Sequence, residues 1–433
     1  MKKVHKLSEE LIDFIHNSAS PFHAVDTMAG QLEKAGFKAL NLSDEWRLTM
    51  GGKYYLSRNG SALFAFIIGS GEPEVEGFKI LAAHSDSPTF RIKPDPEIDS
   101  DNHFVRLNTE VYGGPILMTW LDRPLSIAGR VSLRSNQPLW PDNRLVNFNR
   151  PLLIIPSLAI HLNRTVNEGI ELNRQKEMLP ILGLTKGKNL GRGMLKRMLA
   201  KELGVADDDI LDYDLSLNEY NRGCIMGYDN EFISAPKLDN LAMAHAALKG
   251  LLGSKPGKST QMVAIFDNEE VGSLTKQGAD SPLLRNLFER ILLHLGLSGE
   301  KIQRTIYQSF MISADMAHSV HPSHTEKYDP VLHPLINRGP VIKITANQKY
   351  TSDADSIAVF VQICEKAGVP YQKFVNHSDI AGGSTLGNIS SGHLDIRTVD
   401  VGNPMLAMHS VRELAGVEDH AYMIKAFSTF FNL

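Results

Sequence analysis

The sequence predicts an α/β protein with a mostly parallel central sheet flanked by helices, and with an inserted, mainly β domain. Apolar runs alternate with segments of helical periodicity in residues 1–90 and again in residues 234–433. Helices between buried strands are typical of a parallel sheet. Residues 91–233 instead contain short β-type runs broken by Pro and Gly, such as "GRVSLRS". We therefore expect one α/β domain built from both ends of the chain and a second domain inserted between them.

Local signals define the expected elements of the α/β domain. Ser20 and Pro21 are typical of a helix start, Gly36 marks its end, and Asn59-Gly60 predicts a β-hairpin. Apolar runs and periodicity predict strands at 78–83, 261–266, 309–314, 340–345, 371–375 and 396–401, and helices at 237–253, 282–296, 353–368 and 419–431.

The charge of the chain argues against nucleic acid as a partner. The 433 residues have a formal net charge of −4, so no overall attraction to nucleic acid or to an anionic membrane is expected. One basic segment, 185–201, contains Gly191 and Gly193, but it follows no buried strand and an acidic stretch comes directly after it. We interpret this segment as a solvated loop and helix face.

Cysteine content and hydropathy indicate a cytoplasmic protein. Cys224 and Cys364 are too few for a disulfide framework, which fits a reducing compartment. The longest apolar runs are too short to cross a bilayer. The N-terminal segment lacks the apolar core of a signal peptide, so we expect no membrane partner.

Residues that commonly bind metals follow four of the predicted strands. In open α/β sheets, functional groups gather in the loops beyond the carboxyl ends of the strands. The four stretches are "ILAAHSD", "MVAIFDNEE", "FMISADMAH" and "IRTVDVGNPMLAMH", and the helix "LDNLAMA" starts with a further acid. Together they offer His84, Asp239, Glu270, Asp315 and His409. This set suits two divalent metal ions, with zinc as the first expectation and manganese or cobalt as alternatives, and the lack of thiolate argues against a closed structural zinc site.

Four of these residues also have a simpler structural interpretation. Asp239 could be a helix N-cap, His84 a core histidine, Asp315 a turn residue and His409 a packing residue. The convergence of so many ligand types at one edge of the predicted sheet favours the metal interpretation.

Two further acids suit supporting roles. Asp86 lies two residues after His84, so both side chains point to one side of an extended segment, and the carboxylate can orient a ligating imidazole. An Asx-turn at Asp86 is the alternative. Hydrolysis needs a general base that is not itself a ligand, and Glu269, beside Glu270, suits that role. Because consecutive strand residues face opposite sides, we predict a turned backbone between Asp267 and Glu270.

The sequence also resembles the aspartyl aminopeptidase family, metallo-aminopeptidases that assemble into tetrahedral dodecamers and include the vacuolar aminopeptidases. The matching stretches run along nearly the whole chain and include "SPFHAV", "AAHSDSPTFRIKP", "VYGGPILMTWLDRPLSIAGRV", "PSLAIHLNR", "FDNEEVGS", "SADMAHSVHPSH", "GPVIKITANQKY", "GGSTLG" and "IRTVDVGNPMLAMHSVREL". The resemblance implies a zinc-exopeptidase-like fold. It also implies a dinuclear metal-dependent aminopeptidase that removes N-terminal Asp or Glu from peptides, with residues 91–233 serving oligomerisation and substrate gating.

The resemblance divides the five ligands between two metal ions. It implies that His84 and Asp315 bind one ion, that Glu270 and His409 bind the other, and that Asp239 bridges them.

The resemblance further assigns catalytic and substrate-binding residues. Glu269 would activate a metal-bridging water and Asp86 would orient the imidazole of its neighbouring ligand. The implied substrate contacts are His161, which would reach the site of a neighbouring subunit, His318, Lys343 and Tyr350. From the residues alone, Lys343 could instead be an edge-strand charge and Tyr350 a packing residue.

Two other functions stay open at this point. The first is the same hydrolase with neutral or broad N-terminal specificity, because the charge of Lys343 does not reveal where its side chain points. The second is a non-catalytic oligomeric scaffold, which would require neither the ligand set nor Glu269.

Overall fold

The computed structural model describes residues 2–185 and 192–433, which divide into two compact units. Unit 1 comprises Met1–Asp86, Gly223–Met408 and Glu413–Leu433, and unit 2 comprises Ser87–Arg222 and His409–Arg412. The part of the basic segment that covers residues 186–191 lies outside the described residues.

The boundaries of unit 2 differ from those expected for the inserted domain, 91–233. Unit 2 begins at Ser87 and its long segment ends at Arg222. The strands β11 (Cys224–Met226) and β12 (Phe232–Ala235) belong to unit 1 because β12 pairs with both β11 and a C-terminal strand of that unit.

Unit 1 is built on a nine-stranded, mostly parallel sheet. Parallel pairing joins β13, β4, β14 and β18, whereas β3 and β16 join this central group antiparallel. In sheet order the strands are β1 (Lys38–Ala39), β2 (Lys53–Arg58), β3 (Ala62–Ile67), β13 (Thr260–Phe266), β4 (Phe78–His84), β14 (Phe310–Ala314), β18 (Arg397–Gly402), β16 (Val341–Lys343) and β17 (Gln372–Phe374).

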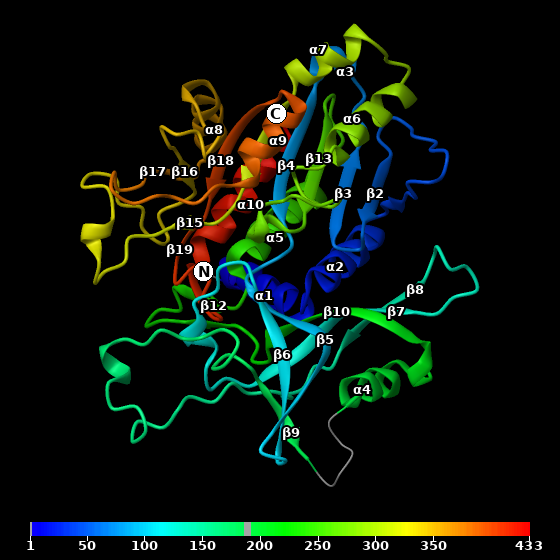
Figure 1. Ribbon diagram of the computed structural model, residues 1–433. Helices are drawn as coiled ribbons and strands as arrows, with labels where there is room; N and C mark the ends of the chain where they lie inside the picture. The colour runs from blue at the N-terminus through cyan, green and yellow to red at the C-terminus, as the bar shows by residue number, and fades with distance from the viewer. Residues whose placement is uncertain (1, 186–191) are drawn as a thin grey trace. The chain divides into compact units, whose positions relative to one another are not determined.

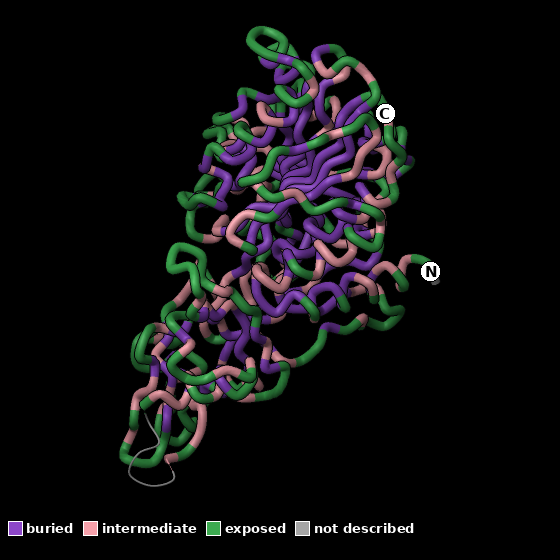
Figure 2. Tube along the Cα trace, turned by 90° about the vertical axis from the view of Figure 1, so that its right-hand side faces the viewer, coloured by how far each residue is buried: buried purple, intermediate pink, exposed green. Residues whose placement is uncertain are grey.

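Helices cover both faces of this sheet, as Figure 1 shows. Because side chains alternate along a strand, Leu81 and Ala83 of β4 pack on one helical layer and Ile80 and Ala82 on the other. The strands therefore form the most deeply buried part of the unit (Figure 2). One layer contains α1 (Lys2–Asn17), α2 (Pro21–Lys34), α5 (Leu238–Leu252), α8 (Ala354–Ala367) and α10 (Val417–Phe431), and the other contains α6 (Leu283–His294), α7 (Glu300–Gln308) and α9 (Leu386–Leu394).

The local signals in the sequence are confirmed by these elements. The Ser20 hydroxyl accepts a hydrogen bond from the His23 N–H at the start of α2, and Gly36, just beyond the helix, has a φ of 85°. Asn59 and Gly60 both have positive φ in the turn between β2 and β3, as a tight hairpin requires. The short helices α7 and α9 were not expected from the sequence.

A second, five-stranded sheet completes unit 1 and carries the C-terminal part of the chain. Its order is β11, β12, β20 (Glu413–Gly416), β19 (Pro404–Leu406) and β15 (Ala317–His318). The remaining short elements of the unit are α3 (Pro73–Glu76) and the 3₁₀ turns η4 (Glu269–Val271) and η5 (Thr325–Lys327).

Unit 2 contains an antiparallel six-stranded sheet with its own apolar core. Phe90, Leu125, Ile127 and Leu215 are fully buried in this core. In sheet order the strands are β8 (Asp142–Asn147), β7 (Leu125–Leu133), β10 (Ile210–Glu219), β5 (Thr89–Ser100), β6 (Phe104–Tyr112) and β9 (Ile181–Leu184), with the helix α4 (Met194–Leu203) and the turns η1 (Leu117–Trp120), η2 (Val166–Glu168) and η3 (Asp207–Asp209). Across the described residues of both units, no helix has the length and apolar character required to cross a membrane.

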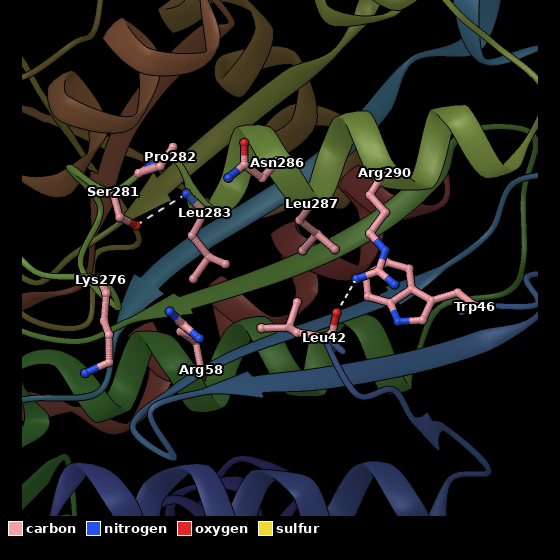
Figure 3. Close-up of a pocket in the computed structure, with 10 residues that line it drawn as sticks. All are labelled: Leu42, Trp46, Arg58, Lys276, Ser281, Pro282, Leu283, Asn286, Leu287 and Arg290. Atoms are coloured by element: carbon pink, nitrogen blue, oxygen red, sulfur yellow. Dashed lines mark hydrogen bonds between the residues drawn. The ribbon is translucent and has the colours of Figure 1, made fainter. Parts of the chain in front are cut away.

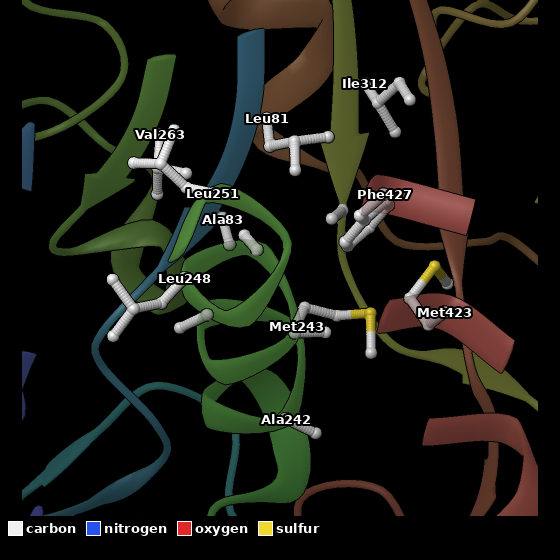
Figure 4. Close-up of a cluster of buried hydrophobic side chains, with 14 of the residues drawn as sticks. Leu81, Ala83, Ala242, Met243, Leu248, Leu251, Val263, Ile312, Met423 and Phe427 are labelled. Atoms are coloured by element: carbon white, nitrogen blue, oxygen red, sulfur yellow. The ribbon is translucent and has the colours of Figure 1, made fainter. Parts of the chain in front are cut away.

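The helix α5, which starts at the expected site, packs against both the sheet and α10 (Figure 4). Burial of a large apolar side chain contributes roughly 1.5–3 kcal/mol. The cluster combines residues of α5, of α10 and of three central strands, namely Met243, Leu248, Leu251, Met423, Phe427, Leu81, Val263 and Ile312. The start of α5 is therefore anchored to the same strands that carry the other candidate ligands.

A buried histidine pair also joins α5 to α10. His245 Nδ1 lies 2.9 Å from His420 Nε2, and both side chains are almost fully buried. Burial lowers the pKa of His420 to about 3, and burial together with His420 lowers the pKa of His245 well below its usual value. The pair is therefore uncharged in the folded protein at neutral pH.

This pair predicts loss of stability in acid. The unfolded chain binds protons on both histidines below about pH 6.5, whereas the folded protein does not, so their contribution is present above that pH and lost below it. We expect the melting temperature of metal-free protein to fall as the pH is lowered from about 7 to about 4. The free energy of unfolding should fall by up to about 1.4 kcal/mol per histidine and pH unit. His420→Gln should reduce the slope of melting temperature against pH, measured by circular dichroism.

The exposed His333 provides the control, since His333→Gln should leave the slope unchanged. A wild-type slope in His420→Gln would show that the buried pair does not contribute to acid sensitivity.

Candidate metal centre

Three of the predicted ligands meet at the carboxyl ends of central strands. His84 is the last residue of β4, and Asp315 directly follows β14. His84 Nε2 lies 3.5 Å from Asp315 Oδ1 and 3.8 Å from Asp239 Oδ1. One nitrogen and two carboxylate oxygens of these residues lie within 4.8 Å of one another, which is the spacing of a metal-binding group.

Asp239 is brought to this group by an irregular start of α5. Its φ of −83° and ψ of 105° are not helical, and the Asp239–Asn240 peptide bond is cis. The Asp239 N–H donates to Glu413 Oε2 at 3.0 Å, and Asn240 Nδ2 donates to the Ala314 carbonyl at 2.9 Å. Asn240 is also not helical, so the regular part of α5 begins after it.

The backbone turns before the two adjacent glutamates. Strand β13 ends at Phe266, Asn268 has a left-handed φ of 63°, and Glu269 begins the 3₁₀ turn η4. The predicted departure from extended geometry between Asp267 and Glu270 is thus confirmed. The Asn268 side-chain oxygen accepts hydrogen bonds from Thr275 Oγ1 at 2.9 Å and Gln277 Nε2 at 2.8 Å, which fix the turn.

Asp86 links His84 to this turn. Its carboxylate is fully buried, and Oδ1 lies 3.3 Å from His84 Nδ1. The same carboxylate accepts the Glu269 N–H at 3.2 Å and the Glu270 N–H at 3.1 Å. Sequence reasoning found the contact with the imidazole but missed the two backbone contacts, because they connect residues that are far apart in the chain.

Burial and close charges shift the pKa values of this cluster. Burial alone would lower the pKa of His84, but Asp315 and Asp86 outweigh it and raise the pKa well above its usual value. Burial raises the pKa of Glu269 to about 8, despite the opposing effect of His84. Burial would also raise the pKa of Asp315, but Lys343 and His84 hold it below its usual range.

Lys343 and Tyr350 lie beside Asp315. Lys343 Nζ donates to Asp315 Oδ2 at 2.9 Å and lies 5.6 Å from the centre of the Tyr350 ring. Strand β16, which carries Lys343, lies between β18 and β17, so the edge-strand interpretation of Lys343 is wrong. Tyr350 is buried in a small apolar cluster with Val341 and Phe374, in agreement with the packing interpretation.

The other predicted residues occupy different surroundings. His318 is exposed at the end of β15, with its ring 5.9 Å from that of Phe374. His161 is exposed in unit 2. His409 also groups with unit 2, has a φ of 67°, and its Nδ1 lies 3.1 Å from the Gly114 carbonyl. The assignment of His409 as a metal ligand therefore stays a prediction from the sequence.

Asp400 is a buried acid that sequence reasoning did not select. It lies within β18, and its carboxylate accepts the Thr351 N–H at 2.6 Å and the Thr385 hydroxyl at 2.8 Å. These bonds hold the segment after Tyr350 and the "GGSTLG" loop. A Cβ at Gly387 would approach Asp400 Oδ1 to 2.5 Å, so only glycine allows α9 to pack this closely.

The donor set fits divalent metal ions. His84 takes part in two groups of ligand-type atoms, one with Asp239 and Asp315 and one with Glu269 and Glu270. Imidazole and carboxylate are the usual ligands of catalytic zinc sites. The second nitrogen of the His84 ring faces Asp86, as is typical of metal-binding histidines.

Comparison with known proteins identifies the family. A family model described as aminopeptidase I zinc metalloprotease (M18) matches residues 14–431. The chain belongs to this family. It is a metallo-aminopeptidase of the M18 type, a family whose description names zinc.

Curated relatives in the M18 family match the chain end to end. The "Probable M18 family aminopeptidase 2" of Clostridium novyi is 54% identical over 433 residues, which is 100% of both chains. The protein of the same name from Pseudomonas aeruginosa strain UCBPP-PA14 is 42% identical over 428 residues, with 98% of each chain covered.

Solved structures of M18 relatives share the fold. Ape4, in a cryo-EM structure of its complex with Nbr1, has a TM-score of 0.94 and 34% identity, over 99% of this chain and 86% of that chain. The S. cerevisiae mApe1 dodecamer has a TM-score of 0.85 and 28% identity, over 98% of this chain and 96% of that chain.

The role of Asp86 can be tested by Asp86→Asn. An amide in place of the carboxylate turns an N–H donor toward one of its three partners and removes the negative charge beside His84. We expect kcat to fall by about 10–100-fold, the usual cost of losing a group that orients a metal ligand. The measurement combines steady-state kinetics with metal analysis of the purified enzyme.

Asp379, whose side chain is 92% exposed, provides the matched control. Asp379→Asn should retain wild-type kcat. Wild-type kcat in Asp86→Asn would contradict the positioning role.

Proposed function

We propose that the chain is a dinuclear aminopeptidase that removes N-terminal residues from peptides, acidic residues first, with Glu269 as the general base. The observation that carries the proposal is the meeting of His84, Asp239 and Asp315 at the carboxyl ends of central strands, with Glu269 and Glu270 on the adjoining turn. Five ligands of these types are enough for two metal ions when Asp239 is shared between them. In this proposal the ligands are His84, Asp239, Glu270 and Asp315, with His409 as the fifth from the sequence.

Glu269 has the position of a proton carrier. When bound, the metal ions supply Lewis acidity that polarises a carbonyl oxygen and lowers the pKa of water. Glu269 Oε2 lies 3.9 Å from His84 Nε2, beside the ligand set. Its carboxylate takes a proton from the attacking water and delivers it to the leaving amine nitrogen. In the metal-free protein, burial raises the pKa of Glu269 to about 8, well above the usual value for a carboxyl group.

Asp86 keeps the two glutamates in separate roles. Its hydrogen bonds to the N–H groups of Glu269 and Glu270 fix the turn that carries both side chains. Glu270 can then bind metal while Glu269 accepts and donates the proton.

The preference for acidic residues depends on Lys343. A lysine ammonium has three N–H donors, and Asp315 uses one of them. The others are available to the carboxylate of an N-terminal Asp or Glu. We propose that His161, His318 and Tyr350 complete the substrate contacts.

We also propose that the chain acts in the cytoplasm as a homo-oligomer, a tetrahedral homododecamer in which His161 serves a neighbouring subunit and unit 2 contributes the subunit contacts. Support comes from a relative solved as a dodecamer and from the exposure of His161. The scaffold alternative is disfavoured because assembly alone would need neither the ligand set nor Glu269.

Glu269→Gln is the direct test of the mechanism. Glutamine has nearly the same shape but cannot accept the proton of water, so kcat should fall by at least about 10²–10⁴-fold. Bound metal, measured by inductively coupled plasma mass spectrometry, should stay at the wild-type level. Glu300→Gln, at the start of α7, should have wild-type activity. Retained activity in Glu269→Gln would exclude Glu269 as the base.

A substrate panel after metal removal tests the remaining parts of the proposal. Chelation should abolish activity, and zinc, manganese and cobalt should be added back separately to identify the best metal. With aminoacyl substrates, kcat/KM for Asp and Glu should exceed that for Leu and Ala by at least about tenfold, or 1.4 kcal/mol. Faster cleavage of Leu would support the broad-specificity alternative. Protein that binds two metal ions but cleaves no substrate would support the scaffold.

A further inference from the structure

Unit 1 contains an apolar pocket that none of the candidate ligands lines (Figure 3). It lies between the segment that follows β1 and the first half of α6, and its volume is about 330 Å³. Its walls are the side chains of Leu42, Trp46, Leu283 and Leu287. Small-molecule sites usually have roughly 300–1,000 Å³, so this pocket suits a ligand with about one aromatic ring.

Three cationic side chains border this pocket, namely Arg58, Lys276 and Arg290. None of its ten described lining residues is acidic, although the chain as a whole has a net charge of −4. Within residues 2–185 and 192–433, the side chains of Arg58 and Lys276 form no hydrogen bond or ion pair. Helix α6 also begins at the pocket, where the Ser281 hydroxyl accepts the Leu283 N–H at 3.4 Å, and its positive end adds to the attraction for an anion.

The wall of the pocket is held in place before any ligand arrives. The Arg290 guanidinium lies 3.8 Å from the centre of the Trp46 ring and donates to the Leu42 carbonyl at 2.7 Å and to the Asp44 carbonyl. The indole N–H donates to the Asn41 carbonyl at 2.8 Å. A segment without regular structure is thereby fixed against α6, and a rigid wall lowers the entropic cost of binding.

We propose that this pocket binds a small organic carboxylate, with its apolar body between Trp46 and Leu287 and its carboxylate at Arg58 and Lys276. An apolar ligand without charge would form no ion pair with Arg58 or Lys276. An inorganic anion would make no contact with the apolar walls. Only a molecule that combines the two features matches the whole lining.

The pocket is connected to the turn that carries Glu269. Lys276 lies between Thr275 and Gln277, and these two neighbours donate to the side-chain oxygen of Asn268. The Asp267 N–H in turn donates to the Gln277 carbonyl at 3.1 Å. A carboxylate that holds Lys276 therefore stabilises the segment that supports the turn.

This connection predicts a direction for the effect on activity. A ligand stabilises the arrangement to which it binds relative to others that the loop can adopt. This step rests on the proposed role of Glu269, which requires the turn described above. Occupancy of the pocket should therefore raise kcat.

Binding can be measured with 4-phenylbutyrate on the zinc-loaded enzyme by isothermal titration calorimetry. We expect one equivalent to bind per chain, and 4-phenylbutan-1-ol and acetate to bind at least tenfold more weakly. The double variant Arg58→Gln/Lys276→Gln should bind 4-phenylbutyrate at least tenfold more weakly than the wild type.

The control variant loses the same charge on the same side of the unit. Arg285 lies on α6 but does not line the pocket, and Lys301 lies on α7. Arg285→Gln/Lys301→Gln should bind 4-phenylbutyrate like the wild type. Equal binding by the Arg58/Lys276 variant would show that the carboxylate occupies another site, such as the metal ions, and would overturn the proposal. Absence of binding, or equal binding of the alcohol, would also overturn it.

The effect on catalysis is tested separately at saturating aminoacyl substrate. In the wild type, 4-phenylbutyrate should raise kcat by about twofold or more, and the rise should disappear in Arg58→Gln/Lys276→Gln. Binding without a change in kcat would overturn the connection to the turn. That result would leave the assignment of Glu269 to its own test, in which Glu269→Gln loses activity whether or not the pocket is occupied.

Discussion

The candidate site depends on one buried carboxylate that serves three partners. Asp86 contacts the imidazole of His84 and accepts the backbone N–H groups of Glu269 and Glu270. Its carboxylate lies beside the Nδ1 atom of the buried His84 ring and at the start of the short turn. The same interaction therefore connects β4 with the end of β13, two strands that are neighbours in space and more than 170 residues apart in sequence. Without it, nothing in the strands themselves would determine the direction of the two glutamate side chains.

The sheet supplies the rigidity on which this interaction depends. Both faces of β4 and β13 are buried under helices, so neither strand can shift without exposing apolar side chains to water. The parallel register places His84 directly opposite Phe266, and the functional loops begin on both strands at the same level. The α5–α10 packing and the hydrogen bonds of Asp239 and Asn240 to Glu413 and Ala314 extend this rigidity to the start of α5. The packing of the core of unit 1 therefore also fixes the geometry of the site.

The sequence was sufficient to predict what depends on local pattern. The strand ends that carry His84, Glu270 and Asp315 followed from apolar runs that stop at polar residues, and the turn before Glu270 followed from the alternation of side chains. Predictions about long-range contacts were poorer. Lys343 is not on an edge strand, because that outcome depends on which strands become neighbours. Asp400 was missed for the same reason, since Thr351 and Thr385 reach it only in the folded chain.

The side chain of Asn268 closes the chain from residue 268 to residue 277 into a loop of fixed length. Most surface loops tolerate added or deleted residues, because their ends are held by strands or helices and their middle is free. Here Thr275 and Gln277, later in the loop, bind the side chain of Asn268 near its start. One inserted residue would change the spacing between the acceptor and its donors, and would displace Glu269 and Glu270 together. Variation in chain length within this family should therefore be found in other loops, and engineered insertions belong elsewhere.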